Sequence, residues 1–160
     1  MRRSSAASPS PRSLPRLRRL SPPFQQLPFE SVPDLPRVPH RFAEAATRTV
    51  TVAIPGAGDQ PIHVRVFGAG PPLLLVHGLM TTSYSWRYVL PRLGAQYTLY
   101  MPDLLGAGRS GKPYVRYSPD LLADSLGATM DALGIAGAPA IGNSMGGYLC
   151  MRLALRRPSA

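Results

Sequence analysis

The sequence predicts an α/β domain with a mostly parallel sheet that begins with an antiparallel hairpin. Two alternating segments, "RTVTVAI" and "PIHVRVF", flank the turn sequence "PGAGDQ", as in a β-hairpin. Beyond them, short apolar runs alternate with segments of helical periodicity, which is typical of strands joined by crossover helices. The 160 residues suffice for one domain with a hydrophobic core, and the apolar fraction of 44% is ordinary for a globular protein.

The first 45 residues differ from the rest of the chain. They hold nine of the 19 prolines, none of the 15 glycines and about half of the net charge of +10. Such a composition buries too little apolar surface to offset chain entropy. We therefore expect residues 1–45 to form a disordered or extended tail, ending in a strap that lies on a domain of residues 46–160. The Arg and Ser content also fits an organelle transit peptide.

Composition argues against several classes of protein. No basic stripe interleaved with aromatic residues is present, so we do not expect nucleic-acid binding. The single cysteine, Cys150, cannot form an internal disulfide and is expected to be a small buried apolar residue. No apolar run reaches membrane-spanning length. We expect a cytoplasmic protein without a membrane segment, metal or cofactor; the oligomeric state stays open.

Three apolar runs predict the central strands. "PPLLLVHG" contains a strand at 73–76, "YTLYMPD" one at 97–101, and "APAIGNS" one at 138–142. The first is continuously apolar rather than alternating, as expected for a strand that is buried on both faces.

Three segments predict helices. "SYSWRYVLPRL" is expected to form a short helix that Pro91 bends or ends. "SPDLLADSLGATMDALGI" is the clearest helix, with Ser118 as its cap and Pro119 in the first turn. Its apolar side chains fall on one face: Leu121, Leu122, Leu126, Met130 and Leu133. "MGGYLCMRLALRR" predicts a last helix.

A motif follows each central strand. "VHGLM" follows the first, "PDLLGAGRSG" the second, and Gly142-Asn143-Ser144-Met145-Gly146, a G-x-S-x-G pattern, the third. In an open α/β sheet, ligands bind beyond the carboxyl ends of the strands. The three motifs therefore predict one functional site at that edge.

From about residue 48 to the end, the sequence resembles the α/β-hydrolase superfamily, in the branch with HG-x, D-x-x-G-x-G-x-S and G-x-S-x-G motifs. The resemblance implies that Ser144 is a nucleophile on a strained strand-to-helix turn, with Gly142 and Gly146 relieving the crowding there. It also implies that the backbone N–H groups of Leu79 and Met145 form an oxyanion hole.

The resemblance assigns supporting roles to the other motif residues. His77 and Gly78 would support the oxyanion loop, although His77 could also be read as a base. The tight turn after the second strand would be built by Asp103, Gly106, Gly108 and Ser110. His40 and His63 are not expected to serve Ser144. Tyr84 and Trp86 are expected either to line the pocket or to pack in the core.

The catalytic set of this family is incomplete in the sequence. Its triad runs in the order serine, acid, histidine, yet no Asp, Glu or His follows Ser144. We therefore expect part of a longer serine hydrolase for a small-molecule ester or related acyl substrate, inactive by itself. An acyltransferase, a carbon–carbon bond hydrolase (suggested by "GNSMGG") and a non-catalytic binding remnant stay open. Dehalogenases and epoxide hydrolases of this fold carry Asp at position 144, so the serine argues against both.

Overall fold

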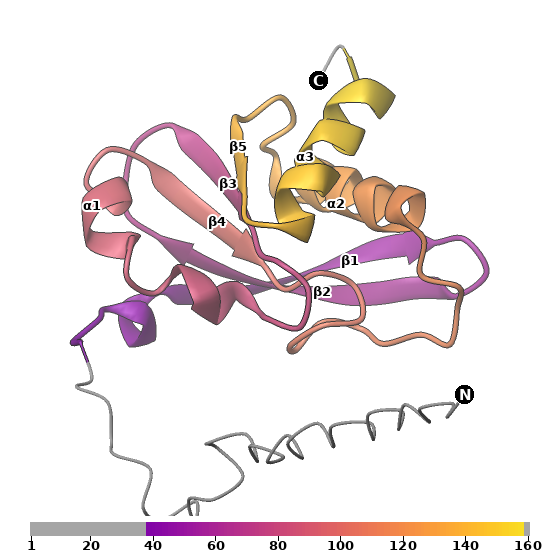
Figure 1. The fold of residues 1–160 in the computed structure, drawn as a ribbon, viewed down its shortest axis with the longest axis horizontal. Helices are drawn as coiled ribbons and strands as arrows, with labels where there is room; N and C mark the ends of the chain where they lie inside the picture. The colour runs from indigo at the N-terminus through magenta and orange to yellow at the C-terminus, as the bar shows by residue number, and fades with distance from the viewer. Residues whose placement is uncertain (1–37, 159–160) are drawn as a thin grey trace, which may run out of the picture. The chain divides into compact units, whose positions relative to one another are not determined.

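The computed structural model describes residues 38–158, which form a five-stranded sheet with helices on both faces (Figure 1). The strands are β1 (Ala46–Ile54), β2 (Gly58–Phe67), β3 (Pro72–Val76), β4 (Thr98–Pro102) and β5 (Ala140–Gly142). The helices are α1 (Leu90–Gly94), α2 (Pro119–Leu133) and α3 (Met145–Arg156), with short 3-10 turns η3 (Phe42–Glu44) and η4 (Ser83–Trp86).

The sheet has the strand order β1-β2-β4-β3-β5. β1 pairs antiparallel with β2, and β2 with β4, whereas β3 runs parallel to both β4 and β5. Val76 lies opposite Gly142 in the register, so β3 and β5 end at the same edge of the sheet. The predicted α/β fold with an N-terminal antiparallel hairpin is confirmed, with the last two strands displaced by one or two residues.

The core lies on both faces of β3. Leu73 and Leu75 pack on one face with Leu90 of α1 and its neighbours. Leu74 and Val76 point to the opposite face, into a cluster with residues of α2 and α3. None of these four β3 side chains is more than 4% exposed. β3 is therefore buried on both faces, as its continuous apolar run predicts.

Helix α2 begins as the sequence predicts. The Ser118 hydroxyl accepts a hydrogen bond from the backbone N–H of Leu121 at 3.1 Å, and Pro119 occupies the first turn. Leu126 and Met130 are buried against the sheet, whereas Leu121 is only half-buried. The cap and the apolar face together determine where this helix starts and which side it buries.

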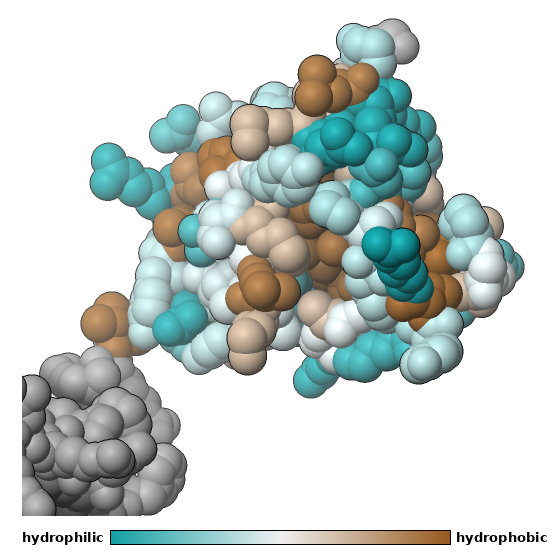
Figure 2. Space-filling view, turned by 45° about the vertical axis from the view of Figure 1, so that its right-hand side comes forward, coloured by the Kyte–Doolittle hydropathy of each residue, from teal (hydrophilic) through white to brown (hydrophobic). Residues whose placement is uncertain are grey.

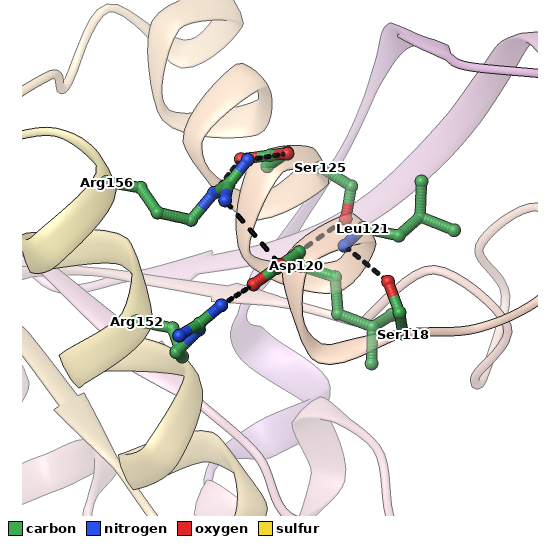
Figure 3. Close-up of polar contacts among 8 residues, drawn as sticks. Ser118, Asp120, Leu121, Ser125, Arg152 and Arg156 are labelled. Atoms are coloured by element: carbon green, nitrogen blue, oxygen red, sulfur yellow. Dashed lines mark hydrogen bonds and ion pairs between the residues drawn. The ribbon is translucent and has the colours of Figure 1, made fainter.

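Ion pairs join α2 to α3 on the outside of the domain. Arg152 and Arg156 of α3 both reach Asp120 near the start of α2 (Figure 3). Arg156 also pairs with Asp124 at 2.6 Å. Figure 2 shows hydrophilic side chains gathered over these two helices near the C-terminal end. Exposed pairs of this kind each contribute about 0–1 kcal/mol, so they orient the helices more than they stabilise them.

The segment around Pro91 differs from the prediction. Residues 83–94 do not form one helix that Pro91 bends or ends: they form η4 and then the separate helix α1, with Pro91 in its first turn. A proline is accommodated there because the first N–H groups of a helix have no intrahelical acceptor.

The compact unit that the structure describes begins at Pro39. Ala45 is only 5% exposed, and the Arg65 guanidinium lies 4.9 Å from the centre of the Phe42 ring. The expectations for residues 1–37 fall outside the described part of the chain. Within that part, Cys150 is half-buried against the core, and burial raises the pKa of its thiol. No helix of residues 38–158 is long and apolar enough to cross a membrane.

We expect the chain to associate with itself through β5. This strand lies at one end of the sheet and exposes Ile141 to 43%, so it offers unpaired backbone groups beside an apolar side chain. Light scattering of the 160-residue chain should show a mass that rises with concentration. Ile141→Lys should reduce this association, whereas Thr49→Lys on the opposite edge strand should not. A monomer at all concentrations, or equal effects of the two variants, would contradict this prediction.

Candidate functional site

The loops that follow β3, β4 and β5 meet at one edge of the sheet. The backbone N–H of Asn143 donates to the carbonyl of Val76 at 3.0 Å, which joins the end of β5 to the end of β3. The backbone N–H of Leu104 donates to His77 Nε2 at 3.0 Å, which joins the loops after β4 and β3. The three sequence motifs are thus brought together at the place where an open α/β sheet binds ligands.

Ser144 has an unusual backbone conformation. It lies directly before α3 at φ 54° and ψ −122°, and it is exposed. A residue other than glycine rarely adopts a positive φ, and such conformations cost roughly 1–3 kcal/mol. Backbone hydrogen bonds hold the turn, since Asn143 O accepts from Gly146 N and Ser144 O from Gly147 N, each at 2.9 Å. The turn presents the serine hydroxyl outside the sheet.

Close backbone contacts surround this turn. A Cβ placed on Gly146 would fall inside the van der Waals distance of the Val76 carbonyl oxygen, and one on Gly142 would collide with the Gly146 backbone. Both positions therefore require glycine, because the start of α3 packs directly on the end of β3. Gly78 lies on the other side, where a Cβ would come within 3.3 Å of Ser144 Cβ.

His77 uses both of its ring nitrogens in structural hydrogen bonds. Because Nε2 accepts from the backbone N–H of Leu104, Nδ1 carries the proton and donates to the Gly78 carbonyl at 2.8 Å. The side chain is 1% exposed, and burial lowers its pKa, although the Gly78 hydrogen bond and Asp103 oppose this shift. A neutral imidazole whose two ring nitrogens are both hydrogen-bonded is not available as a base for Ser144.

Asp103 holds the tight turn after β4. Its Oδ1 accepts from the backbone N–H of Ser83 at 2.8 Å, and its Oδ2 accepts from that of Arg109 at 2.9 Å. Gly108 has φ +51°, and a Cβ there would collide with the Asp103 carboxyl group. This buried carboxylate therefore ties the loop after β3 to the loop after β4.

Ser110 and Gly106 complete this turn. The Ser110 hydroxyl donates to the Asp103 carbonyl at 2.6 Å and accepts from the backbone N–H of His63 at 3.0 Å. Gly106 donates its backbone N–H to the Gly111 carbonyl at 2.8 Å and lies against the ring of Tyr117.

A pocket of about 500 Å³ lies beside Ser144. No Asp, Glu, Lys or Arg lines it; its walls are His77, Gly78, Leu79, Met80, Thr81, Thr82, Leu104, Leu105, Gly106, Ala107, Gly108, Tyr117, Leu122 and Met145. Ser144 is not among these residues, although the motif residues Gly78, Leu79 and Met145 are. A pocket with these walls suits an uncharged, apolar group.

Two backbone donors beside Ser144 have no acceptor. The N–H groups of Leu79 and Met145 make no hydrogen bond with any of residues 38–158. Met145 is the first residue of α3, where an N–H has no intrahelical partner. These donors are free to bind an oxygen atom of a ligand.

Sequence reasoning missed some features of the site and left others open. Tyr117 lines the pocket, but it precedes the Ser118 cap without any pattern that marks it. Met80 has φ 57° and is 96% exposed, which no motif indicates. The sequence left two roles open for Tyr84 and Trp86, pocket lining or core packing. Trp86 packs on the core, and Tyr84 lines a different cavity.

Acidic and basic partners for Ser144 are absent from this part of the chain. No side chain of residues 38–158 hydrogen-bonds its hydroxyl. Within the same range, no three His, Cys, Asp or Glu residues lie close enough together to hold a metal ion.

Substituting the two adjacent glycines of α3 should have different effects. Gly146→Ala should destabilise the protein by about 1–3 kcal/mol or more, because the new methyl group collides with the Val76 backbone. Gly147→Ala is the matched control: its Cβ would lie 3.3 Å from Gly142 O, and alanine favours the helix. Urea unfolding of both variants measures the difference; equal losses would contradict the packing argument.

The free energy of unfolding should fall as the pH is lowered from 7 towards 5. The pKa of His77 is depressed below its ordinary value of 6.5, so the unfolded chain takes up a proton first. The stabilisation that the neutral His77 gives to the folded state is fully present above pH 6.5. It is lost as the pH falls through the pKa of His77 in the folded protein. His77→Gln should flatten this dependence in denaturant titrations at several pH values. Burial also lowers the pKa of His63, so His63→Gln should reduce the pH dependence by a separate amount. An unchanged pH dependence in His77→Gln would contradict the prediction for His77.

Comparison with known proteins agrees with this geometry. The model of the alpha/beta hydrolase fold family matches residues 71–160. A 2-hydroxymuconate semialdehyde hydrolase of Pseudomonas sp. (strain CF600) is 39% identical over 95 residues, which cover 57% of this chain and 34% of that protein. A haloalkane dehalogenase of Mesorhizobium japonicum is 34% identical over 113 residues, 71% of this chain and 37% of that protein.

Solved structures extend the likeness to three dimensions. An epoxide hydrolase from an endophytic Streptomyces superposes with a TM-score of 0.62 at 36% identity, covering 71% of this chain and 34% of that one. The chain spans between 28% and 38% of the length of the curated relatives it matches. With the family match over more than half of its residues, and with three strand-end motifs assembled at one edge of the sheet, this chain belongs to the alpha/beta hydrolase fold family.

Proposed function

We propose that this chain carries the nucleophile and the oxyanion hole of a serine hydrolase that cleaves an ester or related acyl bond. The observation that carries the proposal is Ser144 itself, exposed at φ 54° beside two backbone N–H groups without acceptors. Relatives named as hydrolases of different substrates share the fold, so the choice among chemistries depends on the nucleophile. A serine favours an acyl-enzyme.

In the proposed reaction, the Ser144 hydroxyl oxygen attacks the carbonyl carbon of the substrate while its proton passes to a base. The carbonyl oxygen becomes an oxyanion, which the N–H groups of Leu79 and Met145 stabilise. Each such donor is worth about 10²–10³ in rate. The alcohol then leaves with a proton. Water, after giving a proton to the base, attacks the acyl carbon, and the acid is released as the Ser144 oxygen leaves and regains a proton.

The base belongs, in this proposal, to a part of the protein outside these 160 residues. His77 has both ring nitrogens occupied, and no acidic residue or histidine follows Ser144. Without a base, a serine hydrolase keeps only a residual rate of roughly 10³–10⁴ over water. The chain alone should therefore be close to inactive.

A fluorophosphonate probe tests the assignment. It should label a longer protein that contains this chain, and Ser144→Ala should abolish the labelling. Ser85→Ala is the matched control, because the Ser85 hydroxyl only donates to the Thr82 carbonyl and does not line the pocket. The 160-residue chain should react far more slowly. Equal labelling of the wild type and Ser144→Ala would exclude Ser144 as the nucleophile.

A further inference from the structure

A second cavity, of about 390 Å³, lies between β2, η4 and the loop after β4, and it shares Thr82 and Gly108 with the pocket beside Ser144. Unlike that pocket, it has charged side chains in its lining. Its lining consists of Phe42, His63, Arg65, Thr82, Ser83, Tyr84, Asp103, Gly108 and Arg109. The proposed hydrolase reaction uses neither this cavity nor its basic side chains.

The cavity carries an excess of positive charge. The Arg65 guanidinium donates to the Thr47 hydroxyl and the Phe42 carbonyl, both at 2.7 Å and both neutral, so no carboxylate balances it. The Arg109 guanidinium makes no ion pair with residues 38–158. Asp103 is the one carboxylate in the lining, and both of its oxygens already accept backbone N–H groups.

Two buried polar side chains in the lining are unpartnered. His63 is 7% exposed and Ser83 is 4% exposed, yet neither the imidazole ring nor the Ser83 hydroxyl hydrogen-bonds any residue in the described range. Among the polar atoms of the lining, Arg65 Nε is closed off from solvent and has no hydrogen-bond partner in residues 38–158. An unpaired buried donor costs roughly 1–3 kcal/mol. The His63 imidazole and the Ser83 hydroxyl can both donate a hydrogen bond into the cavity.

We propose that this cavity binds a small oxyanion, either inorganic phosphate or the carboxylate group of a small organic acid. Arg109 and Arg65 supply the charge, and Ser83 and His63 supply the donors. Guanidinium groups suit both anions because their N–H donors match the oxygen spacing. The proposal concerns a site separate from Ser144 and holds whether or not the serine is a nucleophile.

Binding should be coupled to the charge of His63. Burial lowers the pKa of its imidazole; Arg109 and Arg65 lower it further, and Asp103 opposes them. A bound anion reverses the electrostatic balance and raises that pKa. Tyr84 is the remaining titratable group of the lining. Anion affinity should therefore increase as the pH falls from 7 to 6.

The test measures thermal unfolding of the 160-residue chain in chloride buffer, with and without about 10 mM phosphate or acetate; that concentration exceeds a millimolar Kd. Phosphate should raise the midpoint, and Arg109→Gln should weaken apparent affinity about tenfold. Arg92→Gln, an exposed arginine of α1, is the matched control. A rise with acetate as well identifies a carboxylate site, and a rise with phosphate alone a phosphate site.

A second measurement, of histidine protonation, tests the proposal even if the Arg109→Gln variant unfolds. The imidazole signals of the three histidines can be followed by NMR, with His63→Gln assigning the one of interest. Phosphate should raise the titration midpoint of the His63 imidazole. The proposal would be overturned if neither anion shifted the thermal midpoint or the His63 titration midpoint. It would also be overturned if Arg109→Gln and Arg92→Gln lost the same amount of anion affinity.

Discussion

The contact between the first turn of α3 and the end of β3 is the constraint on which the rest of the structure depends. Gly146 lies so close to the Val76 carbonyl that no side chain fits between them. The chain must therefore turn from β5 into α3 within two residues, Asn143 and Ser144, and Ser144 takes a positive φ in this turn. The same geometry leaves the Met145 N–H without an acceptor and the serine hydroxyl exposed. The close contact of α3 with β3 thus accounts both for the packing at this edge of the sheet and for the exposure of the candidate site residues.

The polar residues of the other two loops serve that arrangement rather than the chemistry. Asp103 accepts backbone N–H groups from two loops. His77 joins the loops after β3 and β4 through Nε2, while its Nδ1 donates to the neighbouring Gly78 carbonyl. Because these buried groups are fully bonded, the loops are held without strong ion pairs. Their side chains are fully engaged in holding the loops, whereas Ser144 is exposed and is the residue we propose as the nucleophile.

Much of the fold could be predicted from local signals. The apolar run of β3, the Ser118 cap and the three strand-end motifs each have a direct physical cause in the chain. Pro91 was misread because proline fits both the end of a helix and its first turn, and only tertiary packing distinguishes them. The cavity beside His63 could not be predicted either. It depends on β2 lying between β1 and β4, a pairing across almost 40 residues that periodicity does not encode.

The two edges of the sheet are chemically unequal. β1 exposes Thr47, Arg48, Thr49 and Thr51, whereas β5 exposes only Ala140 and Ile141. Charged residues are a common protection of an edge strand, and Arg48 supplies one on β1. Two of the 160-residue chains that pair through β5 form a two-fold symmetric sheet whose two remaining edges are both β1. The asymmetry of the edges therefore favours a discrete dimer over an open-ended fibre.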